Sequence, residues 1–518
     1  MGLEDFTNSA LSVWLTAAIF LTLLLGLSLY TASYQFIWYI SVVAAAVTLF
    51  SFVHDTIWRL FIILLSFRYV RLIVNQAAFC LYKPVAVPTK PTLTAKDVTV
   101  IVPTVEPYGE QFEECIRSIY ANEPAKIIIV AAGPGNYDKA INSTGMYSNV
   151  RVMHCTVQNK RKQICEALSE INTDITVLCD DHVFWPTKFL PCILAPFEDS
   201  DVGCVGTNKR VRRTISRFSF AAFWNFIGCL YLERHNFEIA ATNAVDGGVF
   251  VVSGRTSAHR SAILQDESFI AGFTNEYICF GLFGPLNADD DNFITRWMVD
   301  HGKKIKIQYS EDACIETTLG EYPKFLSQCM RWARTTWRSN PRSLASGRTW
   351  WTQPWCIYAV YLTSFVNFAL FYDAALLLAL WFGLAKPGND RFIGPTAGVL
   401  TLSLWIFGTK LVKPFPHFRR NPHDLVYLPG YILFGYFHSL IKLVALLTFW
   451  YTAWGSRPLS DEEQRLLTDD VAGISRDVAT QTDINEGLSD VVMEGMNGDA
   501  ASNNDKTKGP SKVVNEQK

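Results

Sequence analysis

The chain has 518 residues, of which 49% are hydrophobic and 18% charged, and its formal net charge is −2. This near-neutral balance excludes the bulk basic field with which many proteins bind nucleic acid. The 12 cysteines include no CxxC pair and no Cys/His cluster at zinc spacing, which argues against a structural zinc site and a disulfide scaffold. The apolar runs gather at the two ends of the chain, so we expect a charged domain set between membrane segments.

The first 57 residues predict a transmembrane hairpin. Leu11–Tyr30 and Phe36–Val53 are uncharged apolar runs of about the length that crosses a bilayer. Basic residues accumulate after the hairpin, from Arg59 onward, whereas the connector between the two spans has none. The positive-inside rule therefore places the domain that follows in the cytosol.

Residues 58–95 predict an interfacial amphipathic helix and a linker. Trp58–Tyr82 mixes apolar stretches with Arg68 and Arg71, which suits the membrane surface better than a span. The prolines around Pro84–Pro91 then end regular structure.

Residues 96–345 predict an α/β domain with a mixed, mostly parallel sheet. Short β-branched runs alternate there with longer amphipathic stretches, as in a doubly wound fold. In such sheets ligands bind beyond the carboxyl ends of the strands. The expected strands are Val98–Pro103, Lys126–Ala132, Val150–His154 and Asp174–Asp181, and the expected crossover helices are Glu110–Asn122 and Lys160–Asn172.

Residues 346–457 return to membrane character. We expect an interfacial helix followed by spans near Val366–Leu384 and Ile393–Val412. Leu425–Trp450 is apolar but broken by Pro429-Gly430, so crossing, re-entry and an interfacial position all stay open. Residues 458–518 are polar and predict a disordered tail.

Two candidate sites follow strands of the predicted sheet. Glu106, after the first strand, is either a uracil or ribose contact or a solvated loop residue. Asp180-Asp181-His182 ends a buried strand, where adjacent carboxylates are costly unless paired or bound to metal. Mn²⁺ or Mg²⁺ bridging a diphosphate suits these ligands. The alternative is a cap for the next helix.

A triple aspartate, Asp289-Asp290-Asp291, precedes another amphipathic stretch. Adjacent carboxylates repel one another, so at least one should have a raised pKa if it is partly buried. A general base that deprotonates an acceptor hydroxyl uses such a group. The alternative is an acidic helix N-terminus stabilised by the helix dipole.

Gln328, Arg331 and Trp332 form a fourth candidate site before the membrane region. Trp332 offers a flat face for stacking on a sugar ring, and Arg331 offers a fork for phosphate oxygens. We expect the basic residues that follow, Arg338 and Arg342, to face lipid headgroups.

Taken in order, these motifs resemble the processive family-2 glycosyltransferases, namely hyaluronan, chitin and cellulose synthases. The shared pattern is a D-x-D-like site, a G/T-E/D-D site and Q-x-x-R-W before a membrane bundle, and it spans about Lys96–Trp332. Ser253-Gly254 resembles the family's SG motif at the acceptor site, and Trp454–Arg457 resembles its W-G-T-R element. The overall likeness is to a fungal type 2 glycosyltransferase, and it implies a GT-A fold.

The resemblance also implies roles for individual residues. Asp291, the second carboxylate of the pair Asp290-Asp291, would be the catalytic base, and Gln328, Arg331 and Trp332 would grip the diphosphate and the acceptor end. Asp181 with His182 would occupy the metal position, although the usual second aspartate of D-x-D is missing. Contacts to the nucleotide-sugar would come from Glu106, Lys162 (or its neighbour Arg161), Asp180, Asp181, Ser253 and Gly254.

The implied reaction transfers a sugar, with inversion, from a UDP-sugar donor to a glycan acceptor. We expect a membrane-embedded hexosyltransferase that extends a polysaccharide of the cell wall or capsule and exports it through the plasma membrane. Its partners would then include membrane lipids, and its catalytic domain would be cytosolic. Two alternatives stay open: a non-processive enzyme that makes a glycolipid, and a catalytically silent membrane scaffold.

Overall fold

The computed structural model describes residues 55–213, 218–386 and 394–452. The chain divides into two units, residues 1–454 and 455–518, and every described residue belongs to the first. Several sequence predictions lie outside the described residues, namely the spans Leu11–Tyr30 and Phe36–Val53, the element Trp454–Arg457 and the tail 458–518.

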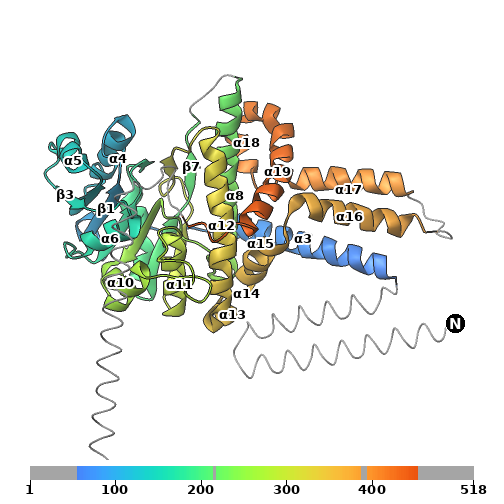
Figure 1. Ribbon diagram of the computed structural model, residues 1–518, viewed down its shortest axis with the longest axis horizontal. Coiled ribbons are helices and arrows are strands. Elements are labelled where there is room, and N and C mark those ends of the chain that lie inside the picture. Colours follow the sequence, from blue (N-terminus) through green and yellow to red (C-terminus); the bar gives the residue numbers. More distant parts are fainter. Residues whose placement is uncertain (1–54, 214–217, 387–393, 453–518) are drawn as a thin grey trace, which may run out of the picture. The chain divides into compact units, whose positions relative to one another are not determined.

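A mixed sheet runs through the α/β domain (Figure 1). It has seven strands, in the order β3-β2-β1-β4-β8-β6-β9. Neighbouring strands pair in parallel except β8, which is antiparallel to both β4 and β6. The predicted mixed, mostly parallel sheet is therefore confirmed. The strands are β1 (Val98–Thr104), β2 (Lys126–Ala132), β3 (Val150–Cys155), β4 (Ile175–Cys179), β6 (Val202–Thr207), β8 (Thr256–Arg260) and β9 (Lys304–Gln308).

Helices cover both faces of this sheet because side chains alternate between the faces along each strand. On β1, Val100 packs into a cluster with α4 and α7, whereas Ile101 packs into a second cluster with α6, α10 and α11. Both crossover helices expected from the sequence are present, although they end earlier than predicted. The helices of the domain are α4 (Glu110–Tyr120), α5 (Asn136–Thr144), α6 (Lys160–Leu168), α7 (Phe189–Leu194), α8 (Phe220–Asp246), α9 (Ser261–Leu264), α10 (Glu267–Thr274) and α11 (Asp290–Asp300).

A second, three-stranded sheet extends the carboxyl edge of the first. It consists of β5 (Val183–Phe184), β10 (Ile315–Thr317) and β7 (Lys209–Val211), with β10 in the middle. Strand β5 follows β4 along the chain and β7 follows β6, so this small sheet lies where ligands of α/β sheets bind. Helix α8 packs against β7 and against α3 (Thr56–Leu81).

The helical part of the chain contains α3 and all elements after Lys324. Helices α3, α16 and α17 lie side by side (Figure 1), and α12 packs against α19. A bend of 90° separates the segment Pro354–Val366 from α16. The elements are α12 (Lys324–Ala345), α13 (Gly347–Thr352), α14 (Pro354–Cys356), a π-helical turn (Ile357–Leu362), α15 (Thr363–Val366), α16 (Ala369–Leu384), α17 (Pro395–Thr409), α18 (Phe415–Arg420), a 3-10 helix (Pro422–Tyr427) and α19 (Leu428–Leu446).

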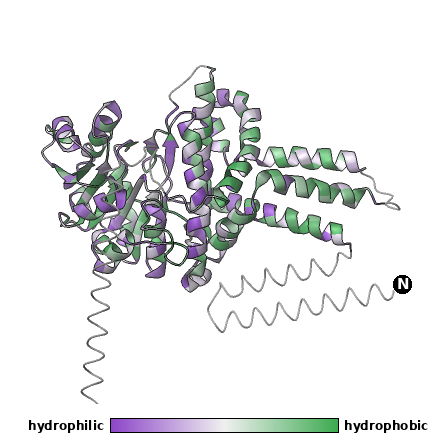
Figure 2. Ribbon diagram, viewed as in Figure 1, coloured by the Kyte–Doolittle hydropathy of each residue, from purple (hydrophilic) through white to green (hydrophobic). Residues whose placement is uncertain are grey.

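The helix expected at Trp58–Tyr82 is present as α3, but it is not amphipathic. Apolar residues occur around the whole helix (Figure 2). The two arginines that suggested the membrane surface point into the protein instead, because Arg68 pairs with Asp373 and Arg71 donates to the carbonyl of Ala359. The interfacial position of this segment stays a prediction.

Among the described residues, one helical segment, Pro422–Leu446, is long and apolar enough to cross a bilayer. The bent pair Pro354–Val366 and Ala369–Leu384 passes the same test only if it counts as one span. Helix α17, at the predicted span Ile393–Val412, is apolar but shorter. The transmembrane character of these segments stays a prediction.

Candidate active site

The antiparallel strand β8 brings two of the sequence motifs together. Thr256, its first residue, pairs with Cys179, the last residue of β4. The segment before β8 therefore lies beside the segment after β4, and the amide of Asp180 donates to the carbonyl of Arg255 at 2.8 Å. In this way Ser253-Gly254 and Asp180 meet at the carboxyl edge of the sheet.

A buried lysine at the start of α6 connects these two motifs to the triple aspartate. Asn159 caps α6, and the Nζ atom of the following Lys160 donates to Asp180 Oδ1 at 2.7 Å and to the carbonyl of Gly254 at 3.0 Å. The same Nζ lies 3.2 Å from Asp290 Oδ2. Burial opposes the charge of Lys160, but Asp180 and then Asp290 outweigh it and raise the lysine's pKa.

The three adjacent aspartates diverge to three different environments. Asp289, which has a left-handed backbone (φ 61°), pairs with Arg338, with Nε 2.6 Å from Oδ2. Asp290 faces Lys160. Asp291 accepts from the amide of Gly254 at 3.2 Å and pairs with no cation among the described residues. Of the three carboxylates, only Asp291 is thus held by uncharged donors alone.

The pKa of Asp291 is raised to about 6. Burial is the largest cause, and the negative charge of Asp290 is the next, while Lys160 acts in the opposite direction. The sequence prediction that one carboxyl of the triplet has a raised pKa is therefore confirmed. A carboxylate that titrates near neutral pH and remains partly exposed suits proton abstraction.

Asp181 and His182 follow Asp180 in the chain, and their side chains contact each other. Thr104, at the end of β1, donates to Asp181 Oδ2 at 2.6 Å, and His182 Nδ1 lies 2.9 Å from Asp181 Oδ1. Burial opposes the charge of His182, but the bond to Asp181 outweighs it and raises the pKa of the imidazole. The two side chains supply donors that Mn²⁺ accepts, one carboxylate and one imidazole.

The described part of the chain contains no group of three or more His, Cys, Asp or Glu side chains placed to hold a metal ion. A cation at Asp181 and His182 would therefore need further oxygen ligands from a substrate. A diphosphate provides such oxygens. The residues fit a metal that binds together with a nucleotide, and do not fit one held by protein ligands alone.

Helix α12 carries Gln328, Arg331 and Trp332 to the same region. The Trp332 ring packs on Tyr231 at a centroid distance of 5.0 Å, and the Arg255 guanidinium lies 5.5 Å from its centroid. Gln328 accepts from the amide of Gly320 at 3.2 Å. None of the described side chains forms an ion pair with Arg331.

Two further residues that the sequence predicts as nucleotide contacts, Glu106 and Lys162, lie outside the contacts described above. Glu106 is exposed in the loop after β1, where its amide donates to Thr104 Oγ1 at 3.1 Å. Lys162 lies on α6, two residues beyond Lys160 and hence about 200° around the helix axis. The lysine that contacts Asp180 and Gly254 is Lys160, which sequence reasoning missed. The cap at Asn159 was the available signal, because it fixes where the helix begins.

Arg338 does not face lipid headgroups, so this prediction was wrong for it, whereas for Arg342, whose side chain is 44% exposed, it stays a prediction. Arg338 is 3% exposed and pairs with Asp289, while Arg342 donates to Glu276 Oε1 at 2.9 Å. Glu276 also accepts from the buried Arg161, whose guanidinium donates in addition to the carbonyl of Ala288 at 2.7 Å. The buried Arg161 and Arg338 fix the segment that leads into the triple aspartate, because buried charges must be paired.

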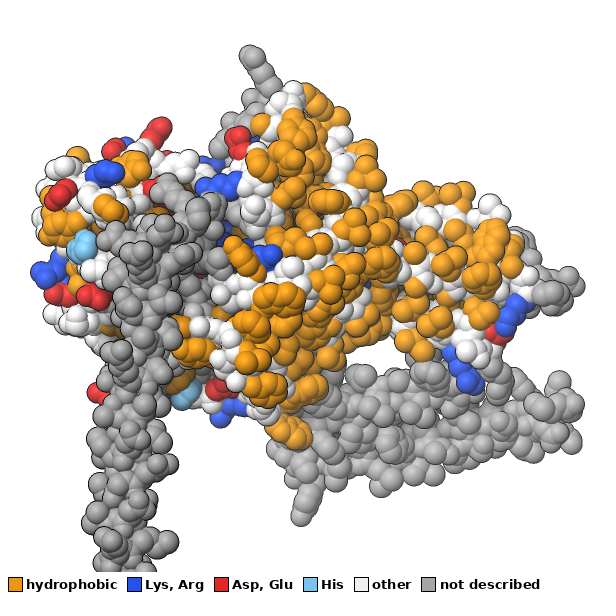
Figure 3. Space-filling model, viewed as in Figure 1, with side chains coloured by type: hydrophobic (Ala, Val, Ile, Leu, Met, Phe, Trp, Pro, Cys, Tyr) orange, Lys and Arg blue, Asp and Glu red, His pale blue; other side chains and the backbone are white. Residues whose placement is uncertain are grey.

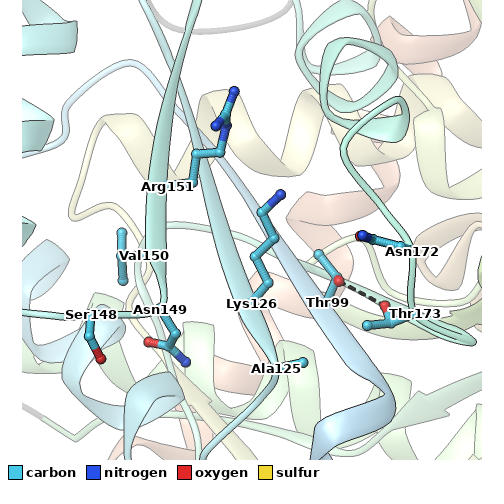
Figure 4. Close-up of a pocket in the computed structure, with 9 residues that line it drawn as sticks. All are labelled: Thr99, Ala125, Lys126, Ser148, Asn149, Val150, Arg151, Asn172 and Thr173. Atoms are coloured by element: carbon cyan, nitrogen blue, oxygen red, sulfur yellow. Dashed lines mark hydrogen bonds between the residues drawn. The ribbon is translucent and has the colours of Figure 1, made fainter.

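A shallow groove of about 450 Å³ lies at the opposite, amino edge of the sheet (Figure 4). Its two cations, Lys126 and Arg151, both pair with Glu170, so their charge is already compensated. None of the motifs described above contributes a lining residue. The carboxyl edge therefore remains the candidate active site.

Comparison with known proteins gives this site a context. A profile described as Glycosyltransferase like family 2 matches residues 95–335. A type 2 glycosyltransferase of Gibberella zeae is 44% identical over 419 residues, which cover 80% of this chain and 78% of that protein. A type 2 glycosyltransferase of Pyricularia oryzae is 42% identical over 432 residues, which cover 82% and 88%.

Among solved structures, a mannosyltransferase of Pyrobaculum calidifontis in complex with GDP-Man and Mn²⁺ aligns with a TM-score of 0.48 and 17% identity. The alignment covers 76% of this chain and 99% of that one.

The identity to the two fungal proteins extends over most of both chains, far beyond the short motifs. It confirms the resemblance at the level of the family, whereas the likeness to processive synthases stays a prediction. The chain belongs to glycosyltransferase family 2, and it is a sugar-transferring enzyme with a GT-A-like α/β domain.

Proposed function

We propose that the chain is an inverting hexosyltransferase that moves a sugar from a UDP-sugar to the end of a growing polysaccharide and exports the product across the membrane. The observation that carries this proposal is the placement of Asp291. Its partly exposed carboxylate has a raised pKa and lies against Gly254, beside the contacts that join Asp290, Lys160 and Asp180.

In the proposed reaction Asp291 takes the proton of an acceptor hydroxyl. The hydroxyl oxygen forms a bond to the anomeric carbon as the bond from that carbon to the UDP oxygen breaks. A single displacement of this kind inverts the configuration, so an α-linked donor gives a β-linkage. With a pKa of about 6, Asp291 is mostly ionised at neutral pH and is still basic enough to accept the proton.

The donor's nucleotide would lie on the other side of Lys160, near Asp180. Asp181 and His182 would hold Mn²⁺ or Mg²⁺ there, and the cation would offset the negative charge of the departing UDP. Lys160 keeps Asp180 ionised: burial opposes this, but Lys160 and then His182 outweigh burial and lower the pKa of Asp180. Asp180 can therefore accept hydrogen bonds from the nucleotide at neutral pH.

The acceptor would be gripped by α12. Trp332 presents an aromatic ring for stacking against a sugar, and its contacts with Tyr231 and Arg255 fix the orientation of that ring. Gln328 and Arg331, on the same helix, would contact the diphosphate and the end of the glycan.

Membrane insertion of the helical part is supported by its surface. Hydrophobic side chains gather over these helices (Figure 3), and such a broad exposed apolar surface is unusual on a soluble monomer. We propose a cytosolic catalytic domain, 96–345, between membrane segments in 1–95 and 346–457, at the plasma membrane. Exposed apolar residues include Phe371, Phe382, Leu400, Leu404, Trp405, Leu433, Phe437, Leu443 and Leu447.

The test is release of UDP by the full-length protein in lipid nanodiscs, across a panel of UDP-sugars with Mn²⁺ or Mg²⁺. We expect metal-dependent release with a preferred donor and its loss in Asp291→Asn. Asp174→Asn, an exposed aspartate at the opposite edge of the sheet, is the matched control and should retain activity. Wild-type turnover by Asp291→Asn would remove Asp291 as the base.

The size of the product decides between the proposal and its nearest alternative. A polymer in the reaction mixture supports a processive enzyme, whereas a single sugar on a lipid identifies a glycolipid-forming enzyme. Absence of UDP release with any donor and either metal would count against catalysis and favour the silent scaffold.

A further inference from the structure

Three nitrogen-bearing side chains beside the catalytic centre take no part in the proton abstraction or the donor contacts above, although one of them, Arg255, also packs on the Trp332 ring. Lys209, the first residue of β7, is 1% exposed, and its Nζ atom has no hydrogen-bond partner among the described residues. The Nδ1 atom of His235 and the Nε atom of Arg255 also have no hydrogen-bond partner among the described residues. We call Lys209, His235 and Arg255 the buried basic cluster.

The register of the sheet brings these three residues together. Gly206 on β6 pairs with Ser257 on the antiparallel β8, so the residues that follow β6 meet those that precede β8. This places Lys209 near Arg255. Helix α8 adds His235, because the side chain of the neighbouring Asn236 holds the backbone of Lys209, with distances of 3.1 Å to its amide and 2.7 Å to its carbonyl.

No acidic side chain in the described part of the chain forms an ion pair with Lys209 or with Arg255. Burial, and next the charge of Arg255, lower the pKa of Lys209 to about 7. Burial also lowers the pKa of His235 well below its usual range, with Lys209 and Arg255 as further causes. The surroundings thus disfavour the charged form of each group, and a bound anion would favour the charged form instead.

Lys160 shows how the same protein treats a buried lysine with a structural role. Its Nζ atom contacts two carboxylates and a carbonyl, whereas Lys209 contacts none. Natural proteins rarely leave a buried ammonium without a partner. The described residues supply no acceptor to Lys209, so its Nζ atom is open to an acceptor from a ligand.

We propose that the buried basic cluster binds an anionic group of a substrate, a carboxylate or a phosphate, next to Asp291. Arg255 and Asp291 are both partly exposed while Lys209 is buried, so the ligand would reach the cluster from the side of Arg255 and Asp291. This inference rests on the proposed function. It goes further in specifying that the substrate group bound beside Asp291 is negatively charged. The two sources of the anion are the carboxylate of a uronic-acid sugar and the phosphates of the nucleotide.

Matched pairs of donors test the proposal. UDP release by the full-length protein in nanodiscs is measured with UDP-glucose against UDP-glucuronate and with UDP-galactose against UDP-galacturonate. The inhibition constant of UDP is measured in parallel. Each measurement is made for the wild type, Lys209→Met and Lys209→Arg.

If the anion is a uronate, kcat/KM of the wild type is at least tenfold higher for the uronate of a pair. Lys209→Met then loses tenfold or more with the uronate and changes less than threefold with the neutral sugar. If the anion is the diphosphate, Lys209→Met instead weakens inhibition by UDP tenfold or more and slows both members of a pair equally. In either case Lys209→Arg, which keeps the charge, recovers part of the loss.

The proposal is overturned if Lys209→Met changes neither donor preference nor inhibition by UDP. Failure of the proposed function is a different outcome, because then the wild type releases UDP from no donor. Thermal unfolding separates binding from folding: removing an unpaired buried amine should leave the melting temperature unchanged or raise it. A lower melting temperature for both Lys209 variants would mean that the lysine is a structural residue and would also overturn the proposal.

Discussion

The helical part of the chain and the catalytic centre bury charged side chains in opposite ways. In the helical part Asp373 pairs with Arg68 and with Lys410, and Asp424 pairs with Arg213 and lies 2.8 Å from His417. At the catalytic centre Asp291 has no cationic partner and Lys209 no acceptor among the described residues.

This difference separates structural charges from functional ones. A buried charge whose partners come from the protein stabilises one conformation, and breaking its pair is costly. A buried charge without such a partner destabilises the fold and is useful only when a substrate completes it. Lys160 belongs to both groups, because it holds Asp180 in place and also acts on the pKa of Asp291.

Lys160→Met would produce the largest effect, because it leaves Asp180 and Asp290 without their shared cation. We expect UDP release to fall by at least about 100-fold, which corresponds to roughly 2.7 kcal/mol in the barrier. Steady-state kinetics in nanodiscs measures this loss. Lys162→Met is the matched control on the same helix. A larger loss in Lys162→Met would make Lys162 the nucleotide contact, as the sequence predicts.

Arg338→Met tests a structural charge. It leaves Asp289 buried without its cation, and we expect destabilisation of about 3–5 kcal/mol. Urea or thermal unfolding of the protein in detergent measures this change. The double variant Arg338→Met/Asp289→Leu removes both charges and should regain much of the loss. A double variant as unstable as the single one would show that packing, not charge, explains the effect.

The pH dependence of transfer tests Asp291 as a functional charge. Because its pKa is raised from 3.8 to about 6, kcat/KM should fall as the pH drops below about 6 and the base becomes protonated. Asp290→Asn removes a neighbouring negative charge, so the acid limb should move to lower pH. Lys160→Met removes a positive charge and should move it to higher pH. Shifts in the same direction would exclude Asp291 as the titrating group.

The same raised pKa makes a prediction about stability. Between about pH 4 and pH 6 the folded protein binds a proton at Asp291 more tightly than the unfolded chain does, so this carboxyl lowers stability as the pH rises through that window. Asp291→Asn should therefore leave the melting temperature at pH 7 unchanged or raise it while abolishing transfer. A lower melting temperature would place Asp291 among the structural charges.

A surface ion pair should give the smallest effect. Lys304 lies 3.0 Å from Asp199 and 3.0 Å from Asp201, and all three side chains are largely exposed. Such pairs contribute about 0–1 kcal/mol, so Lys304→Gln should change the free energy of unfolding by less than about 1 kcal/mol. It is the common control for the variants above, and a larger loss would question the distinction between buried and exposed pairs.

The sequence predicted the sheet well because strand identity depends on local patterns. The β-branched runs of β1 and β2 coincide with the observed strands to within one residue. The rule for such sheets also pointed to the end of β4, where Asp180 lies. The sequence did not predict that Lys160 joins Asp180 to Asp290, because the triple aspartate begins α11 and follows no strand of the sheet.

The sequence predicted less where a side chain's surroundings depend on distant segments. Lys160 and Lys162 differ only in helix phase, and the choice between them needs the position of β8. Arg68 and Arg338 were assigned to the membrane surface because their acidic partners, Asp373 and Asp289, are far away along the chain. Lys209 carries no motif, and only the tertiary structure shows that it lacks a partner.

The reversed direction of β8 has a consequence for exchanging parts between related enzymes. Strand β4 ends at the active-site edge of the sheet, and β8 begins there. The segment 183–252 between them therefore begins and ends at nearly the same place, next to the hydrogen bond from the Asp180 amide to the Arg255 carbonyl. This segment contains Lys209 and His235 but none of the triple aspartate. Transplanting it as a cassette would therefore carry two of the three members of the buried basic cluster into a relative, whose own residue at the position of Arg255 and whose proton-abstracting aspartate would stay in place.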